Sequence, residues 1–109
     1  MIETKIYIGM NDKHTMEQTL EDEKLISILK RVCHYSHVSF SFTVSNGGHF
    51  MDNGEYEEEQ SLILSLIDVD GNTIDEIAKD LCVFFNQESV LITENAVHSY
   101  YVRETLPEV

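Results

Sequence analysis

The sequence predicts an α+β domain whose elements follow one another in the order β-α-β-β-α-β. Two segments place apolar residues at the spacing of a helix, and four segments have the short apolar patterns of strands. Two of the strands lie between the helices, and one lies at each end. This order is the split βαβ, ferredoxin-like pattern, in which two helices cover one face of an antiparallel sheet. A chain of 109 residues is long enough to form one such domain with its own core.

The N-terminal segment 4–9 alternates, with Ile6 and Ile8 on one face and Tyr7 on the other, so it is predicted to be a strand. A polar loop follows, and helical spacing begins at about Asp22. Acidic residues lie at the start of this helix and basic residues near its end, which suits the helix dipole. Its expected apolar stripe comprises Leu25, Ile26, Ile28, Leu29, Val32 and Cys33.

Residues 37–46 are the clearest strand in the sequence. Its predicted inward residues are Val38, Phe40, Phe42 and Val44, and Ser or Thr occupies most of the alternate positions. Asn53-Gly54 is the predicted tight turn of a hairpin, because Gly and Asn tolerate the required backbone angles. The return strand, 57–69, places Leu on one face and mostly Ile on the other, so it is predicted to be central and buried on both faces.

A second helix is predicted over 70–87, with Thr73 and Glu76 forming a capping box at its start. Its expected inner face comprises Ile74, Ile77, Leu81, Phe84 and Phe85. A strand is predicted over 88–95, with Val90 and Ile92 inward. A possible extra C-terminal strand over 96–102 is left open, and about 103–109 is predicted to be a frayed tail.

The net charge of −13 is the strongest compositional signal. It argues against direct binding of nucleic acid or an anionic membrane, because both rest on Lys and Arg. No Lys or Arg lies between Arg31 and Lys79, so one half of the fold is expected to carry an uncompensated negative field.

No apolar run approaches the roughly 20 residues of a membrane helix, and the N-terminus lacks a signal pattern. The expected location is therefore cytoplasmic.

No metal, cofactor or catalytic signature is predicted. Cys33 and His37 are four residues apart, but no second Cys/His cluster lies nearby, so a core thiol is preferred to a zinc ligand. Cys33 and Cys82 are both expected to be buried free thiols. The stretch 68–79 begins like a calcium loop, yet it lacks the required Gly and the final Glu. The stretch "NGGH" lacks the Lys and the helix of a phosphate-binding loop.

The candidate functional surface is the acidic hairpin "DNGEYEEEQ". In an extended strand Glu55, Glu57 and Glu59 point to one side about 7 Å apart, where their like charges repel and do not favour folding. Such a row of carboxylates suits a groove built for the phosphates of nucleic acid. The alternative is a solvated hairpin whose charges protect an exposed edge. The predicted partner-binding residues are Asp52, Glu55, Tyr56, Glu57, Glu58 and Glu59.

Three stretches carry a resemblance to a known group of proteins: "IYIGMNDKHT", "GEYEEEQSLILSLID" and "EIAKDLCVFFNQESVLITE". They resemble an uncharacterised family of small bacterial and mobile-element proteins with a βαββαβ domain of unknown function. The resemblance implies the same fold and no catalytic residues. Its association with mobile elements implies an anti-defence role, such as inhibition of a restriction or CRISPR effector.

The function predicted from the sequence is therefore a small, acidic, non-enzymatic binding protein. It is expected to be an inhibitor, of the anti-CRISPR or anti-restriction type, that docks on a basic protein handling nucleic acid. The alternative is a ligand-binding or enzymatic domain that uses the open sheet face, with Tyr7, His37, His49 and the Ser/Thr row near it. A homodimeric assembly module that buries this face is a third interpretation.

Overall fold

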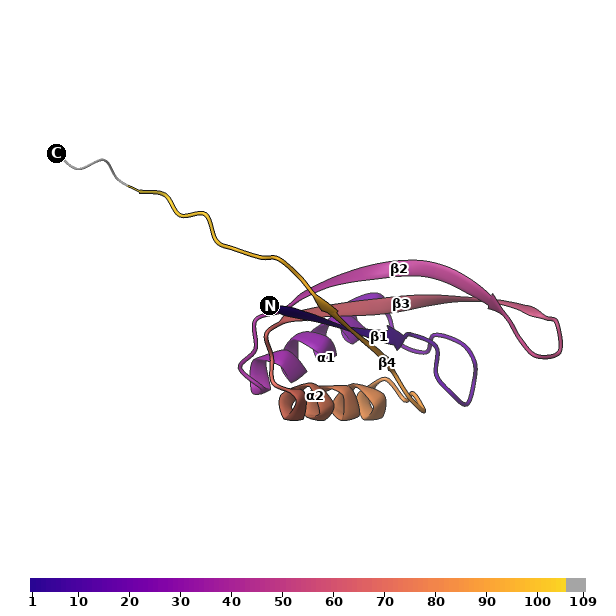
Figure 1. Ribbon diagram of the computed structural model, residues 1–109. Coiled ribbons are helices and arrows are strands. Elements are labelled where there is room, and N and C mark those ends of the chain that lie inside the picture. Colours follow the sequence, from indigo (N-terminus) through magenta and orange to yellow (C-terminus); the bar gives the residue numbers. More distant parts are fainter. Residues whose placement is uncertain (106–109) are drawn as a thin grey trace.

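A computed structural model describes residues 1–105, and the chain folds as an antiparallel sheet with two helices packed on one of its faces (Figure 1). The order of elements is the predicted β-α-β-β-α-β. The elements are β1 (Ile2–Gly9), α1 (Asp22–Tyr35), β2 (Ser41–Phe50), β3 (Tyr56–Ile67), α2 (Gly71–Phe84) and β4 (Leu91–Ala96). The α+β, ferredoxin-like fold predicted from the sequence is thereby confirmed.

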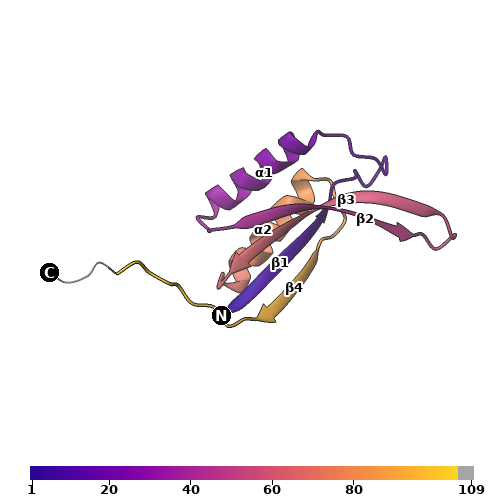
Figure 2. The ribbon, with the colours of Figure 1, turned by 90° about the horizontal axis from the view of Figure 1, so that it is seen from above.

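The strands lie in the order β2-β3-β1-β4, and every neighbouring pair is antiparallel. β3 and β1 are the two central strands, while β2 and β4 form opposite edges (Figure 2). One row of the open face crosses all four strands, because Ile63 pairs with Thr43 and with Tyr7, and Tyr7 pairs with Leu91. The helices leave this row uncovered, so the alternation of β1 and β3 divides the sheet into a core face and an open face.

The core lies between the sheet and the helices. Its most fully buried apolar side chains are Ile6, Ile8, Leu29, Leu62, Leu64, Leu66, Ile77 and Leu81. The central position predicted for the third strand is confirmed, but its burial on both faces is not. Ile63 is half-buried and Ile67 is 43% exposed, because neither helix crosses to the open face.

Both helices contain 14 residues, and among the residues described neither is long and apolar enough to span a membrane. The start of α2 differs from the predicted capping box. Its N-cap is Asp70, whose carboxylate accepts hydrogen bonds from the Thr73 backbone N–H (3.1 Å) and hydroxyl (2.7 Å). Thr73 therefore lies inside the helix, and Asp70 satisfies the N-terminal amide in its place. Phe84, predicted to face the core, is 56% exposed because α2 ends there and Phe85 takes the buried position.

Residues 97–105 leave the sheet in an extended conformation and form no strand with the described part of the chain. The extra strand considered for 96–102 is therefore not formed beyond Ala96, the last residue of β4. Val97 closes the sheet edge by donating its N–H to the Met1 carbonyl oxygen (2.9 Å). Of the tail predicted over 103–109, residues 106–109 lie outside the described residues.

Removing a core side chain of β3 should destabilise the protein much more than removing a side chain from its open face. We expect Leu64→Ala to lower the free energy of unfolding by about 2–5 kcal/mol, because Leu64 is fully buried between the sheet and the helices. Ile67→Ala, on the open face of the same strand, should cost about 1 kcal/mol or less. Urea denaturation of both variants measures the difference, and equal losses would contradict the one-sided burial of β3.

Candidate ligand site at the base of the hairpin

The β2–β3 hairpin extends well beyond the rest of the sheet (Figure 2). The ladder between β1 and β3 ends at Gly9 and Ser61, whereas β3 continues to pair with β2 as far as Phe50 and Tyr56. The projecting part carries all the acids predicted to bind a partner, and it also carries Gly47 and Gly48. Water can solvate these charges on a projecting ribbon, which explains how the fold tolerates them.

The tip of the hairpin turns where the sequence predicts. Gly54 adopts a φ of 85°, and its N–H donates to the Met51 carbonyl oxygen (2.8 Å). The Asn53 side-chain oxygen accepts a hydrogen bond from the Glu55 N–H (2.9 Å), an arrangement that stabilises turns locally. The prediction of a turn at Asn53-Gly54 is thus confirmed.

The acids do not share one face. Glu57 and Glu59 point to the same side, as predicted for these two residues; it is the open side of the sheet, and both are half-buried. Tyr56 and Glu58 point to the opposite, helix side, while Glu55 precedes the strand. The predicted row of three carboxylates with an aromatic anchor is therefore split between two faces, because alternation in β3 separates Tyr56 from its acidic neighbours.

A polar hollow of about 530 Å³ lies at the hairpin base, on the side where Tyr56 and Glu58 point. Four Asn and Gln residues line it, namely Asn11, Gln18, Asn46 and Gln60, and the Gln18 side-chain amide already donates to the Leu20 carbonyl oxygen (2.8 Å) and the Asp22 carboxylate (2.6 Å). Glu58 adds a carboxylate on this side, Glu59 lines the hollow from the other face of the ribbon, and Gly47 and Gly48 form part of the wall. The Tyr56 ring lies over Gly48, where any Cβ would overlap its hydroxyl and ring atoms.

A second hollow, of about 360 Å³, lies on the open face and shares Gly47, Gly48 and Glu59 with the first. Its other lining residues are Tyr7, Gly9, Ser61 and Gln87. A Cβ at Gly9 would overlap the Glu59 carboxylate, so Gly9 leaves the space that this side chain occupies. The two hollows meet at a thin, glycine-containing ribbon, and Glu59 lines both.

A hydrogen-bonded corner holds the loop beside these hollows. The Gln87 side-chain amide donates to the Asn11 carbonyl oxygen, and the Asn86 side chain donates to the Asp12 carboxylate at 2.6 Å. The Asn86 hydrogen bond, followed by one from the His14 N–H, lowers the pKa of Asp12 below its ordinary value of 3.8. The first and third of the stretches that carry the resemblance therefore meet at this corner, although Asp12 and Asn86 are 74 residues apart in sequence.

Several residues of the site did not stand out in the sequence. The amides Gln18, Asn46 and Gln60 lie on three separate segments, and nothing in their spacing indicates that they converge. Asn11 and Gln87 fall in stretches that carry the resemblance, which was the only available signal. A Gly-Gly pair inside a strand was a second, unspecific signal of a close approach to the backbone.

The residues of the alternative open-face site are only partly brought together. Tyr7 lines the open-face hollow, and the backbone of His49 pairs with Glu57 on the hairpin. His37 lies elsewhere, beyond the end of α1, in a shallow hollow lined by Lys30, Arg31 and His34. His37 is therefore not part of an open-face site, because α1 ends at Tyr35 and directs it away.

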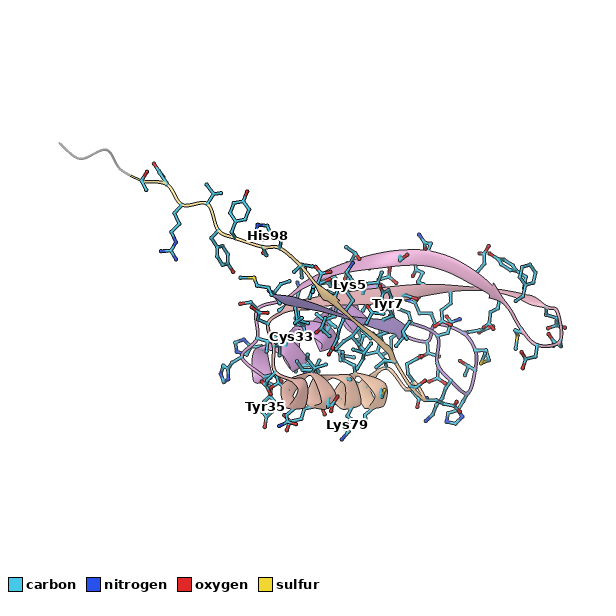
Figure 3. The ribbon with its side chains drawn as sticks, in the orientation of Figure 1. Lys5, Tyr7, Cys33, Tyr35, Lys79 and His98 are labelled. Atoms are coloured by element: carbon cyan, nitrogen blue, oxygen red, sulfur yellow. The ribbon has the colours of Figure 1, made fainter. Side chains whose placement is uncertain are left out.

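Cys33 belongs to α1 and is buried in the core, as predicted (Figure 3). Burial raises the pKa of its thiol to about 11, so it is protonated at neutral pH. Cys82 was also expected to be buried but is only half-buried. Within residues 1–105, no three His, Cys, Asp or Glu side chains gather in a way that could hold a metal ion.

Comparisons with known proteins place the fold among solved structures. No family model matches the sequence, and no curated protein matches it. A phage SAM lyase in complex with S-methyl-5'-thioadenosine is similar with a TM-score of 0.66 at 20% identity, over 86% of this chain and 79% of the lyase. CutA from Pyrococcus horikoshii has a TM-score of 0.57 at 11% identity, over 93% and 88% of the two chains. GlnK of B. subtilis, in complex with ATP, has a TM-score of 0.50 at 17% identity, over 87% and 84%. At these identities the likeness establishes the fold.

The Asp12 corner predicts a pH dependence of stability. The pKa of Asp12 is lowered in the folded state. Ionised Asp12 therefore stabilises the fold fully above the ordinary pKa of 3.8, and this stabilisation is lost as the pH falls through the lower pKa of the folded state. We expect Asp12→Asn to melt a few degrees below the parent at pH 7, with the deficit shrinking in strong acid. Thermal melts from pH 2 to 7 measure this, with Asp52→Asn at the exposed hairpin turn controlling for the change in net charge. A deficit that is constant with pH would contradict the assignment.

Proposed function

We propose that this protein binds a small, cationic nucleoside ligand, of the S-adenosylmethionine class, at the base of the β2–β3 hairpin. The observation that carries the proposal is the polar hollow of about 530 Å³, which is lined by two glutamates, four Asn or Gln residues and a tyrosine. Its volume falls in the range of small-molecule sites. The ligand-binding alternative drawn from the sequence is thereby preferred, with its centre moved from the middle of the open face to the hairpin.

The charge of the hollow favours a cation. Glu58 and Glu59 line it, and its described lining contains no Lys, Arg or His. A sulfonium or ammonium group near these carboxylates gains a charge-assisted interaction. The Tyr56 ring adds a face on which a cation is also stabilised.

The amides of the hollow suit a nucleobase. Asn and Gln each present a donor and an acceptor side by side, the pattern that pairs with the N6 and N7 edge of adenine. Gln60 already donates to the Asn46 side-chain oxygen (3.1 Å), which orients both amides at the wall. At Gly47 nothing lies within 4 Å of the place where a side chain would begin, so a flat ring can approach the backbone there, whereas the Tyr56 ring already covers Gly48.

The comparison with the phage SAM lyase supports the proposed ligand at the level of the fold only. Its structure contains S-methyl-5'-thioadenosine, the thioether that remains when S-adenosylmethionine loses its amino-acid chain. Similarity of fold at 20% identity carries no residue roles to this chain. It supports the choice of a ligand class whose charge and base match the lining of the hollow.

The proposal predicts that binding depends on the charge of the ligand. S-Adenosylmethionine should bind about tenfold more tightly than S-adenosylhomocysteine, which lacks the methyl group and the sulfonium charge. Glu58→Gln should remove most of this preference, whereas Glu94→Gln, on β4, should leave it unchanged. Isothermal titration calorimetry measures both affinities, and chromatography of the mixture reveals any release of methylthioadenosine.

Two results would contradict the proposal. One is the absence of S-adenosylmethionine binding at millimolar concentration. The other is equal affinity for both ligands in the parent and in Glu58→Gln. Release of methylthioadenosine would extend the proposed function from binding to catalysis.

A second candidate is the inhibitor predicted from the sequence, which docks its acidic hairpin on a basic protein that handles nucleic acid. The observation that favours it is the projecting tip, where Phe50 is 76% exposed and Tyr56 is 56% exposed, in tilted contact with ring centroids 5.3 Å apart. Exposed aromatic residues surrounded by charge are typical of interaction surfaces. The division of the acids between two faces weakens a flat docking surface but suits insertion of the tip into a groove.

The inhibitor candidate predicts salt-sensitive capture of a basic partner. Reversing Glu55, Glu57 and Glu59 to Lys should abolish capture of a nucleic-acid enzyme from host lysate, and high salt should do the same to the parent. The matched control reverses Glu23, Glu76 and Glu94, which are exposed outside the hairpin, and should retain capture. Mass spectrometry identifies the captured protein. If the hairpin variant captures the same partner as the parent, this candidate is wrong.

A further inference from the structure

The outer edge of β2 is an unprotected sheet edge. β2 contains ten residues, with no Pro, Lys, Arg, Asp or Glu among them, and no other described strand pairs with its outer side. The Met51 N–H donates to the Glu55 carbonyl oxygen (2.8 Å), so odd-numbered residues of β2 direct their backbone groups to β3 and even-numbered residues direct theirs outward. Phe42, Val44 and Asn46 therefore direct their backbone N–H and C=O groups outward. Edges of this length are normally blocked by charge, proline or a bulge.

The C-terminal arm, which we define as residues 98–105, has the opposite property. It is extended, it forms no strand with the described residues, and its aromatic and aliphatic side chains are exposed. Tyr100, Tyr101 and Val102 are 72%, 82% and 86% exposed. Tyr and Val are among the residues most enriched in strands, so this segment has the composition of a strand that lacks a neighbour.

The arm and the β2 edge of one chain lie on opposite sides of the molecule. The arm follows β4, and the strand order β2-β3-β1-β4 places β4 and β2 at the two ends of the sheet. Figure 1 shows the arm leaving the body on the side away from both helices, and Figure 2 shows it leaving away from the hairpin. The arm and the β2 edge of one chain therefore cannot reach each other, but the arm of one chain can pair with the β2 edge of another.

We propose that the C-terminal arm of one copy pairs as an added strand with the β2 edge of a second copy. The pairing supplies partners for the outward backbone groups of Phe42, Val44 and Asn46 and removes Tyr100, Tyr101 and Val102 from water. Arg103, the only Lys or Arg after Lys79, is brought to the sheet whose hairpin is acidic. The arm and edge are different surfaces, so the contact is head-to-tail and can join successive copies.

The test uses the full chain, because the arm makes no strand contacts in its own copy and can be altered without disturbing the fold. The test variant carries Tyr100→Pro and Tyr101→Pro together. Alternate residues of a strand direct their N–H to the neighbouring strand, so one of these two prolines must remove an N–H that faces β2. The matched control, Tyr100→Phe with Tyr101→Phe, keeps both N–H groups and most of the apolar area. Sedimentation velocity gives the mass, and hydrogen exchange follows the amides of Phe42, Val44 and Asn46.

We expect the parent and the Phe variant to be oligomeric at about 100 µM, with these three amides exchanging at least tenfold more slowly than in the proline variant. The proline variant should be monomeric with an unchanged circular dichroism spectrum. A monomeric parent would overturn the proposal. So would an oligomeric proline variant in which the same amides stay protected.

Discussion

The mismatch in length between β3 and β1 determines the shape of this protein and the position of its candidate site. β3 has twelve residues and β1 has eight, and their pairing ends at Gly9 and Ser61. From that point β3 has β2 as its only neighbour in the sheet, so a two-stranded ribbon must project from a body held together by the buried leucines of β3. A two-stranded ribbon buries little by itself, so its base depends on contacts with the loop after β1. Those contacts are made by the same segments that line the hollow.

The electrostatics of the chain follow from the same geometry. Lys and Arg are absent from 32–78, which includes the whole hairpin, and five acids fall within the nine residues 52–60 of the hairpin. Inside the core such charges would be costly, but on the ribbon Asp52, Glu55 and Glu58 stay exposed and Glu57 and Glu59 are half-buried. Glu58 and Glu59 line the polar hollow at its base. An anionic hollow reached from solvent attracts cations at a distance and holds them once water is displaced.

The sequence predicted the fold well because the fold depends on periodicity. The alternating Ile and Leu of β1 and β3 and the stripe of α1 identify the core face without knowledge of tertiary contacts. The site was predicted only in part, since convergence of Asn11, Gln18, Asn46 and Gln60 depends on where a loop crosses a ribbon.

The face of a strand on which a residue lies was also harder to predict than the strand itself. Tyr56 was grouped with Glu57 by proximity in sequence, although adjacent residues in a strand point in opposite directions. Asp70 and Thr73 lie three residues apart and both are residue types that cap helices, so only the geometry of the structure shows that Asp70 is the N-cap.

The two surfaces assigned to the hairpin use different parts of the same strands and are compatible. Under the proposed function, ligand contacts at the base would come from side chains of β3 and from the glycine backbone of β2, on the two faces of the ribbon. Contacts with a second copy would come from the backbone of β2 in that plane, at its outer edge. An added strand would widen the ribbon from two strands to three and stiffen the wall that contains Gly47 and Gly48. Because a flexible wall loses conformational entropy when a ligand binds, a wall already ordered by a neighbouring copy would bind the ligand more tightly. Assembly and ligand binding would then strengthen each other through β2, without any residue of the arm touching the ligand.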